Sequence, residues 1–330
     1  MRISNNMLSR NLLLNLWAAQ GRIDKLQNQL STGQKINRPS DDPVGTENSL
    51  RFKSNISYLN QLKANAKEGI AYMDTTDDTM GEMTSMIQRA KELAIRAMNT
   101  STVNDEDRKK IAIEIDQIRE HVIELANTKV GTKYIFGGTA NVEPFPKGAT
   151  DWQGSDDTKK FQVGGDLSIE VSVNGHDLFG AGWEYAEVTI PAPTDPPTYE
   201  YKKGSGSGIA MFDTLAQLSK ALNESNINGV DDDGAGPNED GVEVLLGKLE
   251  LQADHISDVR AQLGARQNRM DSVYTQLDST SANLGDSLST VLYADIAETL
   301  VNFKTQDSIY QAALSVGTKI IQPSLADFLR

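Results

Sequence analysis

The residue types that most often carry chemistry lie far apart in this chain. Its three histidines are His121, His176 and His255, and none belongs to the H-E-x-x-H spacing by which one helix binds zinc. Cysteine is absent, which excludes disulfides, thiolate zinc sites and a cysteine nucleophile. We therefore interpret the histidines as ordinary surface or core side chains, and we expect neither a metal site nor a cofactor.

Two short stretches have the composition of ligand loops, but their spacing is wrong. Residues 231–234, DDDG, offer carboxylates for calcium, yet placing Gly234 at the sixth loop position puts Gly229 where the first carboxylate belongs and Asp240 where a glutamate belongs. Residues 204–208, GSGSG, lack the lysine and the following serine or threonine of a phosphate-binding loop. We interpret the first stretch as a solvated loop and the second as a flexible linker.

Asp41 and Asp42 are adjacent carboxylates that could act as a catalytic pair. A helix start explains them better, because Asp42 can cap the first turn and Pro43 suits the first helical position. The sequence holds no other constellation of nucleophile, base or metal ligands. We therefore predict that the protein is not an enzyme.

The composition is typical of long helices with much surface per residue. Of 330 residues, 24% are charged, 38% are hydrophobic and only 6% are aromatic. The net charge of −14 opposes nucleic-acid binding, because a polyanion gains nothing from counterion release. The sequence lacks the run of about 18 apolar residues that a transmembrane helix needs. Trp17 stands near a potential cleavage site before Gln20 where a small residue is required, so we expect no cleaved signal peptide.

Both ends of the chain carry narrow apolar stripes at helical spacing. The N-terminal stripe steps by 4, 3, 4, 3 and 4 residues, which is the a/d pattern of a helix that packs on a partner helix. We predict that the two terminal stripes cover each other and that the apolar surface left over binds another copy. The residues predicted for this assembly interface are Leu12, Leu16, Ala19, Ile23, Leu26 and Leu30, with Leu288, Val291, Ile296, Leu300, Phe303, Tyr310, Leu314 and Ile321.

Helical and non-helical segments alternate between the two stripes. The first helix is predicted to end at Thr32, with Gly33 in the left-handed position that closes it. A long helix is predicted from Pro43, with the polar run at 74–79, DTTDDT, as the place for an irregularity. Residues 134–136 are predicted to form a short strand, and 141 to 208 to be β-rich, with Asn174-Gly175 as a hairpin turn. Helical period resumes at Val242 and continues to the end of the chain.

The predicted fold class is mainly α with a β-rich insertion. Long N- and C-terminal helices pair as a coiled-coil rod, and a smaller α/β or all-β domain is inserted in the middle. Isolated helices are marginal in water, so we expect the terminal helices to be poorly ordered until a partner covers them. The expected segments are an N-terminal assembly helix with its connector (1–42), the first half of the rod domain (43–140), the inserted outer domain (141–240), the second half of the rod domain (241–283) and a C-terminal assembly helix (284–330).

Several stretches resemble one family, the bacterial flagellins and their hook-junction relatives. These are MRISNNMLSRNLLLNL (1–16), LSTGQKINRPSDDPVG (30–45) and RAKELAIRAMN (89–99) near the N-terminus, and VRAQLGARQNRMDSV (259–273) with the closing heptads near the C-terminus. Three features resemble the junction branch of the family, the hook-associated proteins 3. They are Pro43 after Asp41-Asp42, the motif TKYIFGGTANVEPF (132–145) with Tyr134, Ile135, Phe136, Gly137 and Gly138, and the ending QPSLADFLR.

The resemblance implies a structural role in the bacterial flagellum. Members of the family are exported unfolded through the flagellar type III apparatus, while a chaperone masks the C-terminal helix, and they act outside the cell. The implied partners are like copies in a ring, hook-associated protein 1, flagellin and the export chaperone, with no nucleic acid and no membrane insertion. Two alternatives stay open: a filament flagellin and, more distantly, a coiled-coil signalling protein.

Overall fold

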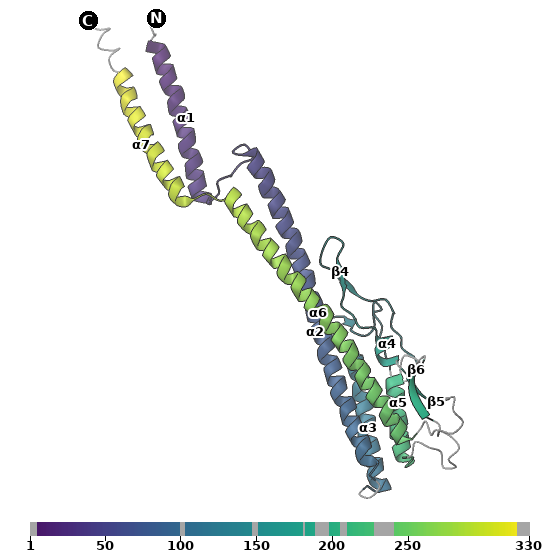
Figure 1. The fold of residues 1–330 in the computed structure, drawn as a ribbon. Helices are drawn as coiled ribbons and strands as arrows, with labels where there is room; N and C mark the ends of the chain where they lie inside the picture. The colour runs from purple at the N-terminus through teal and green to yellow at the C-terminus, as the bar shows by residue number, and fades with distance from the viewer. Residues whose placement is uncertain are drawn as a thin grey trace, which may run out of the picture. The chain divides into compact units, whose positions relative to one another are not determined.

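The structure is a computed structural model that describes residues 5–99, 103–146, 151–180, 182–188, 198–204, 210–227 and 241–321 (Figure 1). Its elements, in chain order, are α1 (Asn5–Thr32), α2 (Pro43–Ala97), α3 (Asp105–Ala126), β1 (Lys129–Val130), β2 (Lys133–Tyr134), β3 (Lys160–Gln162), β4 (Ser168–Glu170), α4 (Gly175–Gly180), β5 (Gly182–Val188), β6 (Thr198–Gly204), α5 (Ala210–Asn223), α6 (Val242–Leu292) and α7 (Ile296–Ile321). The DDDG stretch at 231–234, residues 205–208 of the predicted linker and the ending at 322–330 lie outside the described residues.

Long helices dominate both ends of the chain, and the short strands lie between α3 and α6. The strands pair as three two-stranded antiparallel sheets, β1 with β2, β3 with β4 and β5 with β6. In the β3–β4 hairpin, for example, Phe161 lies opposite Ile169. The predicted fold class is confirmed, since long terminal helices flank a smaller strand-containing region.

The chain divides into two compact units. The first combines residues 1–61 with residues 277–330, and the second consists of Leu62–Gln276. The ends of the chain therefore meet in one unit, while the strand-containing region belongs to the other. The long helices α2 and α6 each contribute residues to both units.

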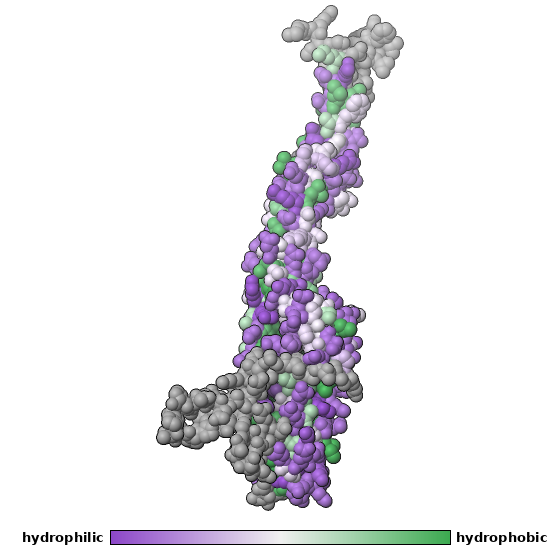
Figure 2. All heavy atoms as spheres, turned by 90° about the vertical axis from the view of Figure 1, so that its right-hand side faces the viewer, coloured by the Kyte–Doolittle hydropathy of each residue, from purple (hydrophilic) through white to green (hydrophobic). Residues whose placement is uncertain are grey.

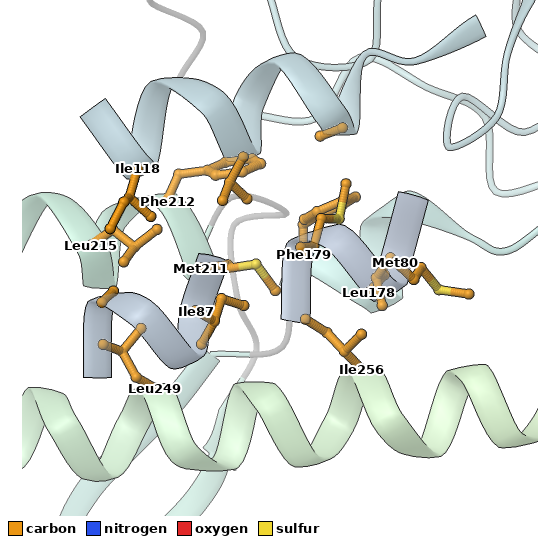
Figure 3. Packing of buried hydrophobic residues seen from close by; sticks show 14 of the residues in the cluster. Met80, Ile87, Ile118, Leu178, Phe179, Met211, Phe212, Leu215, Leu249 and Ile256 are labelled. Carbon is orange, nitrogen blue, oxygen red and sulfur yellow. The ribbon is translucent and has the colours of Figure 1, made fainter. Parts of the chain in front are cut away.

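The second unit has a continuous hydrophobic core formed by α2, α3, α5 and α6 (Figure 3). Ile87 of α2, Ile118 of α3, Leu215 of α5, and Leu249 and Ile256 of α6 converge there with little or no exposed surface. Each such buried aliphatic side chain stabilises the fold by roughly 1.5–3 kcal/mol relative to exposure. The apolar period in α2, α3 and α6 therefore reflects burial within this unit.

Four phenylalanines attach the strand-containing region to this core. Phe136 and Phe145 each make an edge-to-face contact with Phe179, with ring centroids 5.2 and 4.8 Å apart. Phe179 in turn stacks on Phe212 of α5 at 5.3 Å. Such aromatic pairs add about 0.5–1.5 kcal/mol beyond the area that they bury. The cluster joins residues 136–179 to a helix that follows them in the sequence.

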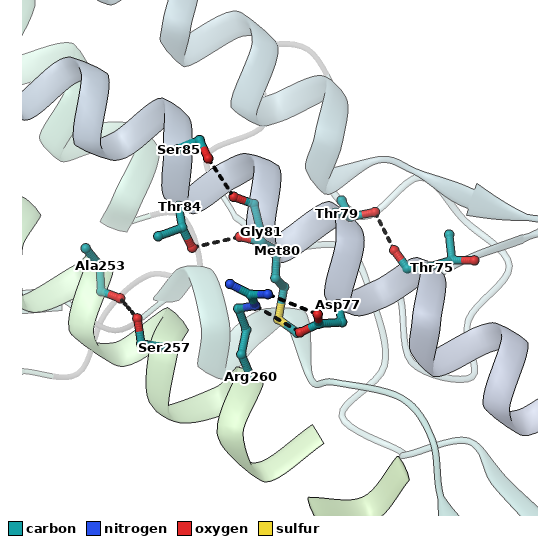
Figure 4. Close-up of polar contacts among 10 residues, drawn as sticks. All are labelled: Thr75, Asp77, Thr79, Met80, Gly81, Thr84, Ser85, Ala253, Ser257 and Arg260. Atoms are coloured by element: carbon teal, nitrogen blue, oxygen red, sulfur yellow. Dashed lines mark hydrogen bonds and ion pairs between the residues drawn. The ribbon is translucent and has the colours of Figure 1, made fainter. Parts of the chain in front are cut away.

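The irregularity predicted at 74–79 is wrong, because α2 continues through this run (Figure 4). The hydroxyls of Thr75, Thr76 and Thr79 donate to the carbonyls four residues earlier, which satisfies them within the helix. The carboxylate of Asp77 accepts two hydrogen bonds from the guanidinium of Arg260 on α6, at 2.9 and 3.0 Å. The polar run is thus satisfied partly within α2 and partly by Arg260 of the neighbouring helix α6.

The helical pattern expected from Val242 to the C-terminus is interrupted after Leu292. Tyr293 forms an isolated antiparallel bridge with Gln34, and the chain re-enters a helix at Ile296. The Asp295 carboxylate caps α7 by accepting from the backbone amides of Ala297 and Glu298, at 2.8 and 3.1 Å. The boundary that we expected between 283 and 284 lies inside α6.

Two local predictions in the strand-containing region are corrected. Asn174-Gly175 is not a hairpin turn but the start of α4. The Asn174 side chain accepts from the amide of His176 at 2.9 Å, and the backbone carbonyl of Asn174 accepts from the amide of Leu178 within α4. Of the strand predicted at 134–136, only Tyr134 belongs to β2. The two residues after it are fully buried, and their carbonyls accept hydrogen bonds from side chains.

Candidate assembly interface

The terminal helices α1 and α7 pack against each other in antiparallel fashion. Leu12 contacts the backbone at Gly317, where an added Cβ would lie 2.9 Å from its Cδ2. About three helical turns further along, the guanidinium of Arg22 donates to the side-chain oxygen of Gln306 at 3.2 Å. The paired positions run in opposite directions along the two helices, so the terminal helices pair within one chain, although only part of the predicted C-terminal stripe lies on the paired face.

The structure brings part of the predicted interface together. In α1, Ala19 is buried and the five other predicted residues are half-buried. In α7, Phe303 and Tyr310 are half-buried, whereas Ile296, Leu300 and Leu314 are exposed. The side chain of Ile321 lies outside the described residues, and Leu288 and Val291 are half-buried in the last turns of α6.

The residues of α7 that are less exposed than its leucines include several that are not strongly apolar. Thr299 and Gly317 are buried, and Gln306 and Ala313 are half-buried, which together with Phe303 and Tyr310 gives steps of 4, 3, 4, 3 and 4 residues. The a/d period of α7 is therefore displaced from its most hydrophobic stripe. The only sequence signal for this face is its spacing of 4 and 3 residues, because several of its members are small or polar and it is not the most hydrophobic stripe of the helix.

Backbone hydrogen bonds connect the segment that follows α1 with the segment between α6 and α7. The amide of Lys35 donates to the carbonyl of Leu292 at 2.7 Å, and the amide of Ala294 donates to the carbonyl of Gly33 at 3.0 Å. Gly33 has a φ of +69°, a conformation that glycine adopts without strain, and it closes α1 as the sequence predicted. These bonds tie the start of α7 to the end of α1.

The Asp-Asp-Pro motif performs the helix-start role expected from the sequence. The Asp42 carboxylate accepts from the amide of Gly45 at 2.9 Å, and α2 begins at Pro43. Asp41 accepts from the amide of Arg38 at 3.0 Å and pairs with Lys25 of α1 at 3.2 Å. The Arg38 amide, together with Lys25, lowers the pKa of the Asp41 carboxyl from its ordinary value. Asp41 thereby fastens the connector to α1.

The motif Tyr134 to Gly138 holds the strand-containing region in place through its backbone. The carbonyl of Ile135 accepts from the Tyr72 hydroxyl of α2 at 3.0 Å, and the carbonyl of Phe136 accepts from the indole of Trp152 at 3.2 Å. The carbonyl of Gly137 accepts from the amide of Ser155 at 3.1 Å. Three consecutive carbonyls thus receive donors from elsewhere in the chain, and neither Tyr72 nor Trp152 was singled out from the sequence.

Gly138 is required at its position for two reasons. Its φ of +63° disfavours any residue with a Cβ, and a Cβ there would lie 1.9 Å from the carbonyl oxygen of Ser155. Tyr134 packs under the ammonium of Lys129, 4.4 Å from its ring centre. The family motif is therefore a structural hub in this protein.

The histidines remain separate in space. His121 lies 3.7 Å from Glu82, His176 lies 4.0 Å from Asp156, and a ring nitrogen of His255 lies 3.1 Å from the Asp177 carbonyl. Within the described ranges, no three side chains of His, Cys, Asp or Glu gather as a metal ion would need. None of the helices described here is long and apolar enough to cross a membrane.

Family models match both ends of the chain. The bacterial flagellin N-terminal helical region matches residues 3–141, and the bacterial flagellin C-terminal helical region matches residues 246–329. These ranges include the terminal helices α1 and α7, the Asp-Asp-Pro motif and the hub motif. The unmatched stretch between them contains most of the strand-containing region.

Full-length relatives are similar over nearly the whole chain. Hook-associated protein 3 of Escherichia coli is 24% identical over 96% of this chain and 96% of its own length. Flagellin of Bacillus subtilis is 25% identical over 95% of this chain and 94% of its own length.

Solved structures share the fold at lower sequence identity. FlgL of Bacillus cereus has a TM-score of 0.54 and 21% identity, covering 72% of this chain and 99% of that one. The flagellar junction protein FlgL of Legionella pneumophila has a TM-score of 0.53 and 16% identity, covering 76% and 100%. With its paired terminal helices and its two matched ends, the chain belongs to the bacterial flagellin family.

Proposed function

We propose that this chain is a structural subunit of the bacterial flagellum that acts as hook-associated protein 3, the junction between hook and filament. The alignment supports a structural role in the flagellum, and the hub motif carries the choice of the junction role. Hook-associated protein 3 of Escherichia coli aligns with this chain over 96% of both lengths, so the alignment includes the strand-containing region as well as the helical ends. The hub motif anchors that region to α2, and this motif resembles the junction branch of the family.

The proposed partners follow from this role. Copies of the chain form a ring that stands on hook-associated protein 1 and seats the first flagellin subunits. Before export, a flagellar chaperone covers the C-terminal helix, and the chain leaves the cell without a cleaved signal peptide. The exposed leucines of α7 support these contacts, because apolar side chains in water gain free energy when a partner covers them.

The division into assembly, rod and outer segments is part of the same proposal. Segments 1–42 and 284–330 serve assembly, segments 43–140 and 241–283 form the rod domain, and segment 141–240 faces solvent. The role is structural and not enzymatic, in keeping with the family. It involves neither nucleic acid nor insertion into a membrane.

Filament flagellin is the second candidate, because the Bacillus subtilis flagellin is as similar over the same length. A strain that lacks this gene separates the two roles. If the chain is the junction protein, hooks are completed and flagellin monomers leak into the medium, and a plasmid copy restores filaments. Normal filaments in the deletion strain overturn the assignment, and hooks without leaked flagellin favour the filament role.

A further inference from the structure

A hollow lies beside the C-terminal half of α3, in the second unit of the chain. Its volume is about 330 Å³, and its lining consists of Arg119, Glu120, Ile123, Glu124, Asn127 and Glu143. The first five residues lie on one side of α3, because they follow one another at steps of 1, 3, 1 and 3. Glu143 belongs to the loop that follows the hub motif. We call this feature the α3 hollow, and its size is within the range of small-molecule sites.

The side chain of Asn127 fixes the loop that forms the other wall of the hollow. Its amide nitrogen donates to the carbonyl of Phe145 at 2.7 Å, and its oxygen accepts from the amide of the same residue at 3.0 Å. The Phe145 ring is buried against Phe179 and Phe212. Since Glu143 is two residues from this anchor, the α3 hollow is largely formed before a ligand enters it.

Three carboxylates of the lining have no basic partner among the described residues. They belong to Glu120 and Glu124 of α3 and to Glu143 of the loop, and all three residues are exposed. Charged groups in a shared concave surface focus the potential on it and raise the local concentration of counterions. The α3 hollow therefore attracts positive charge.

The basic residue of the lining, Arg119, is directed to other acids. Its guanidinium lies 4.0 Å from the carboxylate of Asp116. Burial raises the pKa of the Asp213 carboxyl on α5, and the positive charge of Arg119 opposes this rise. Because Arg119 is shared between these two carboxyls, the α3 hollow keeps its negative charge.

The spacing of the carboxylates indicates an extended cation. Within the described ranges no three acidic or histidine side chains gather as one metal ion would need, so the positive charge of a ligand has to be spread over several atoms. Ile123 is half-buried between the two glutamates of α3 and offers an apolar contact. Ammonium groups separated by methylene chains satisfy both requirements, since the charged groups meet carboxylates and the methylenes cover apolar surface.

We propose that the α3 hollow binds a linear aliphatic polyamine. The ammonium groups lie on the three carboxylates of the lining, and the methylene chain lies over Ile123. This binding goes beyond the structural role proposed above and does not depend on it, because the α3 hollow belongs to the second unit and not to the terminal helices.

General attraction of cations to an acidic protein is the effect that the test has to exclude. The net charge is −14, and hydrophilic residues predominate on the face drawn in Figure 2. At low salt a polyamine gathers around such a surface without any fitted site. Binding is therefore measured at about 0.15 M salt, where the Debye length is about 8 Å.

Isothermal titration calorimetry of the purified full-length chain with spermidine, a linear triamine, measures the site. The test variant combines Glu124→Gln with Glu143→Gln, which keeps the shape of both side chains and removes two charges. The matched control combines Glu47→Gln with Glu106→Gln, two exposed glutamates outside the lining, and removes the same charge. Glu106 lies on α3, 18 residues before Glu124, which is about 27 Å along the helix.

We expect one spermidine per chain, with a Kd at least roughly tenfold higher in the test variant, because two charge-assisted contacts are lost. The control variant should bind like the wild type. Equal Kd values in the test and control variants overturn the proposal, and so does the absence of saturable binding to the wild type. Circular dichroism of all three proteins shows whether they are folded alike.

Competition by magnesium ions on the wild-type chain gives a second measurement that needs no variant. A diffuse counterion layer exchanges readily with Mg²⁺, whereas a single ion cannot reach carboxylates that are too far apart to share it. Spermidine binding should therefore persist at an equal concentration of Mg²⁺. Its loss under that condition overturns the proposed site and leaves the junction role untouched.

Discussion

The hydroxyl of Tyr72, on α2, donates a hydrogen bond to the backbone carbonyl of Ile135 at 3.0 Å, and both residues are buried. This bond joins a long helix to the hub residue that directly follows β2. The next two carbonyls, of Phe136 and Gly137, also accept hydrogen bonds from elsewhere in the chain, so three consecutive carbonyls hold the hub in place. The Tyr72 hydroxyl thus attaches this hub to α2 directly.

Replacing Tyr72 with phenylalanine should destabilise the protein by about 1–3 kcal/mol, because the Ile135 carbonyl is left buried without a donor. Urea unfolding followed by circular dichroism measures this change. Tyr58→Phe is the matched control, since Tyr58 is 51% exposed on the same helix and should change stability little. Equal effects of the two substitutions would contradict a special role for Tyr72.

Alkaline pH should weaken the fold through the same residue. Burial raises the pKa of Tyr72 to about 12, above its ordinary value near 10. A group whose pKa is higher in the folded state contributes its full stability below the unfolded pKa and loses it as the pH rises towards the folded pKa. The contribution is roughly 2–3 kcal/mol. The stability difference between wild type and Tyr72→Phe should therefore shrink between about pH 10 and pH 12, and a difference that stays constant would refute this.

Gly138→Ala should cost more than Gly131→Ala, although both glycines have a positive φ. At Gly131 nothing lies within 4 Å of an added Cβ, so only the backbone conformation is strained, by about 1–2 kcal/mol. At Gly138 the Cβ also collides with the Ser155 carbonyl, and the hub has to move. Thermal unfolding of both variants measures the difference, and similar melting temperatures would count against the hub.

Limited proteolysis of the purified chain should cut within α1 and α7 before it cuts within the core helices. Among the described residues of these two helices, only Ala19, Thr299 and Gly317 are buried, whereas the second unit has a continuous core. Helices with so little buried surface open easily. Mass spectrometry of the early fragments locates the cuts. Terminal helices as resistant as α2 would show that the pair is stable without partners.

A bulky residue at Gly317 should disturb assembly, because Leu12 of α1 packs against that position. Gly317→Leu is compared with Gly285→Leu in α6, where nothing lies within 4 Å of an added Cβ. Both substitutions improve helix propensity by roughly the same amount, so the difference reports on packing. We expect fewer filaments with Gly317→Leu in a complementation assay. Equal filament numbers would mean that the helix pair tolerates a wider spacing.

Local signals in the sequence were sufficient for several features. The order Asp42-Pro43 predicts the start of α2, Gly33 predicts the end of α1, and the period of 3.6 predicts long helices at both ends. They are readable because capping and periodic burial involve neighbouring residues. The zinc-binding, calcium-loop and phosphate-loop motifs can also be checked in the sequence, because each lies within a short stretch.

Tertiary structure decided the features that depend on distant partners. The run at 74–79 stays helical with Asp77 bonded to Arg260, 183 residues later in the chain. The break after Leu292 coincides with the bridge from Tyr293 to Gln34, which no local pattern in α6 predicts.

Which face of α7 meets α1 was also a tertiary decision. The hydrophobic stripe through Leu300 and Leu314 is the stronger signal in the sequence, yet Thr299, Gln306 and Gly317 occupy the less exposed positions. Helical periodicity determines the spacing at which residues of one face recur, and every face of the helix has the same spacing. Only the packing of a partner helix selects one of them, and it leaves the other stripe exposed to water.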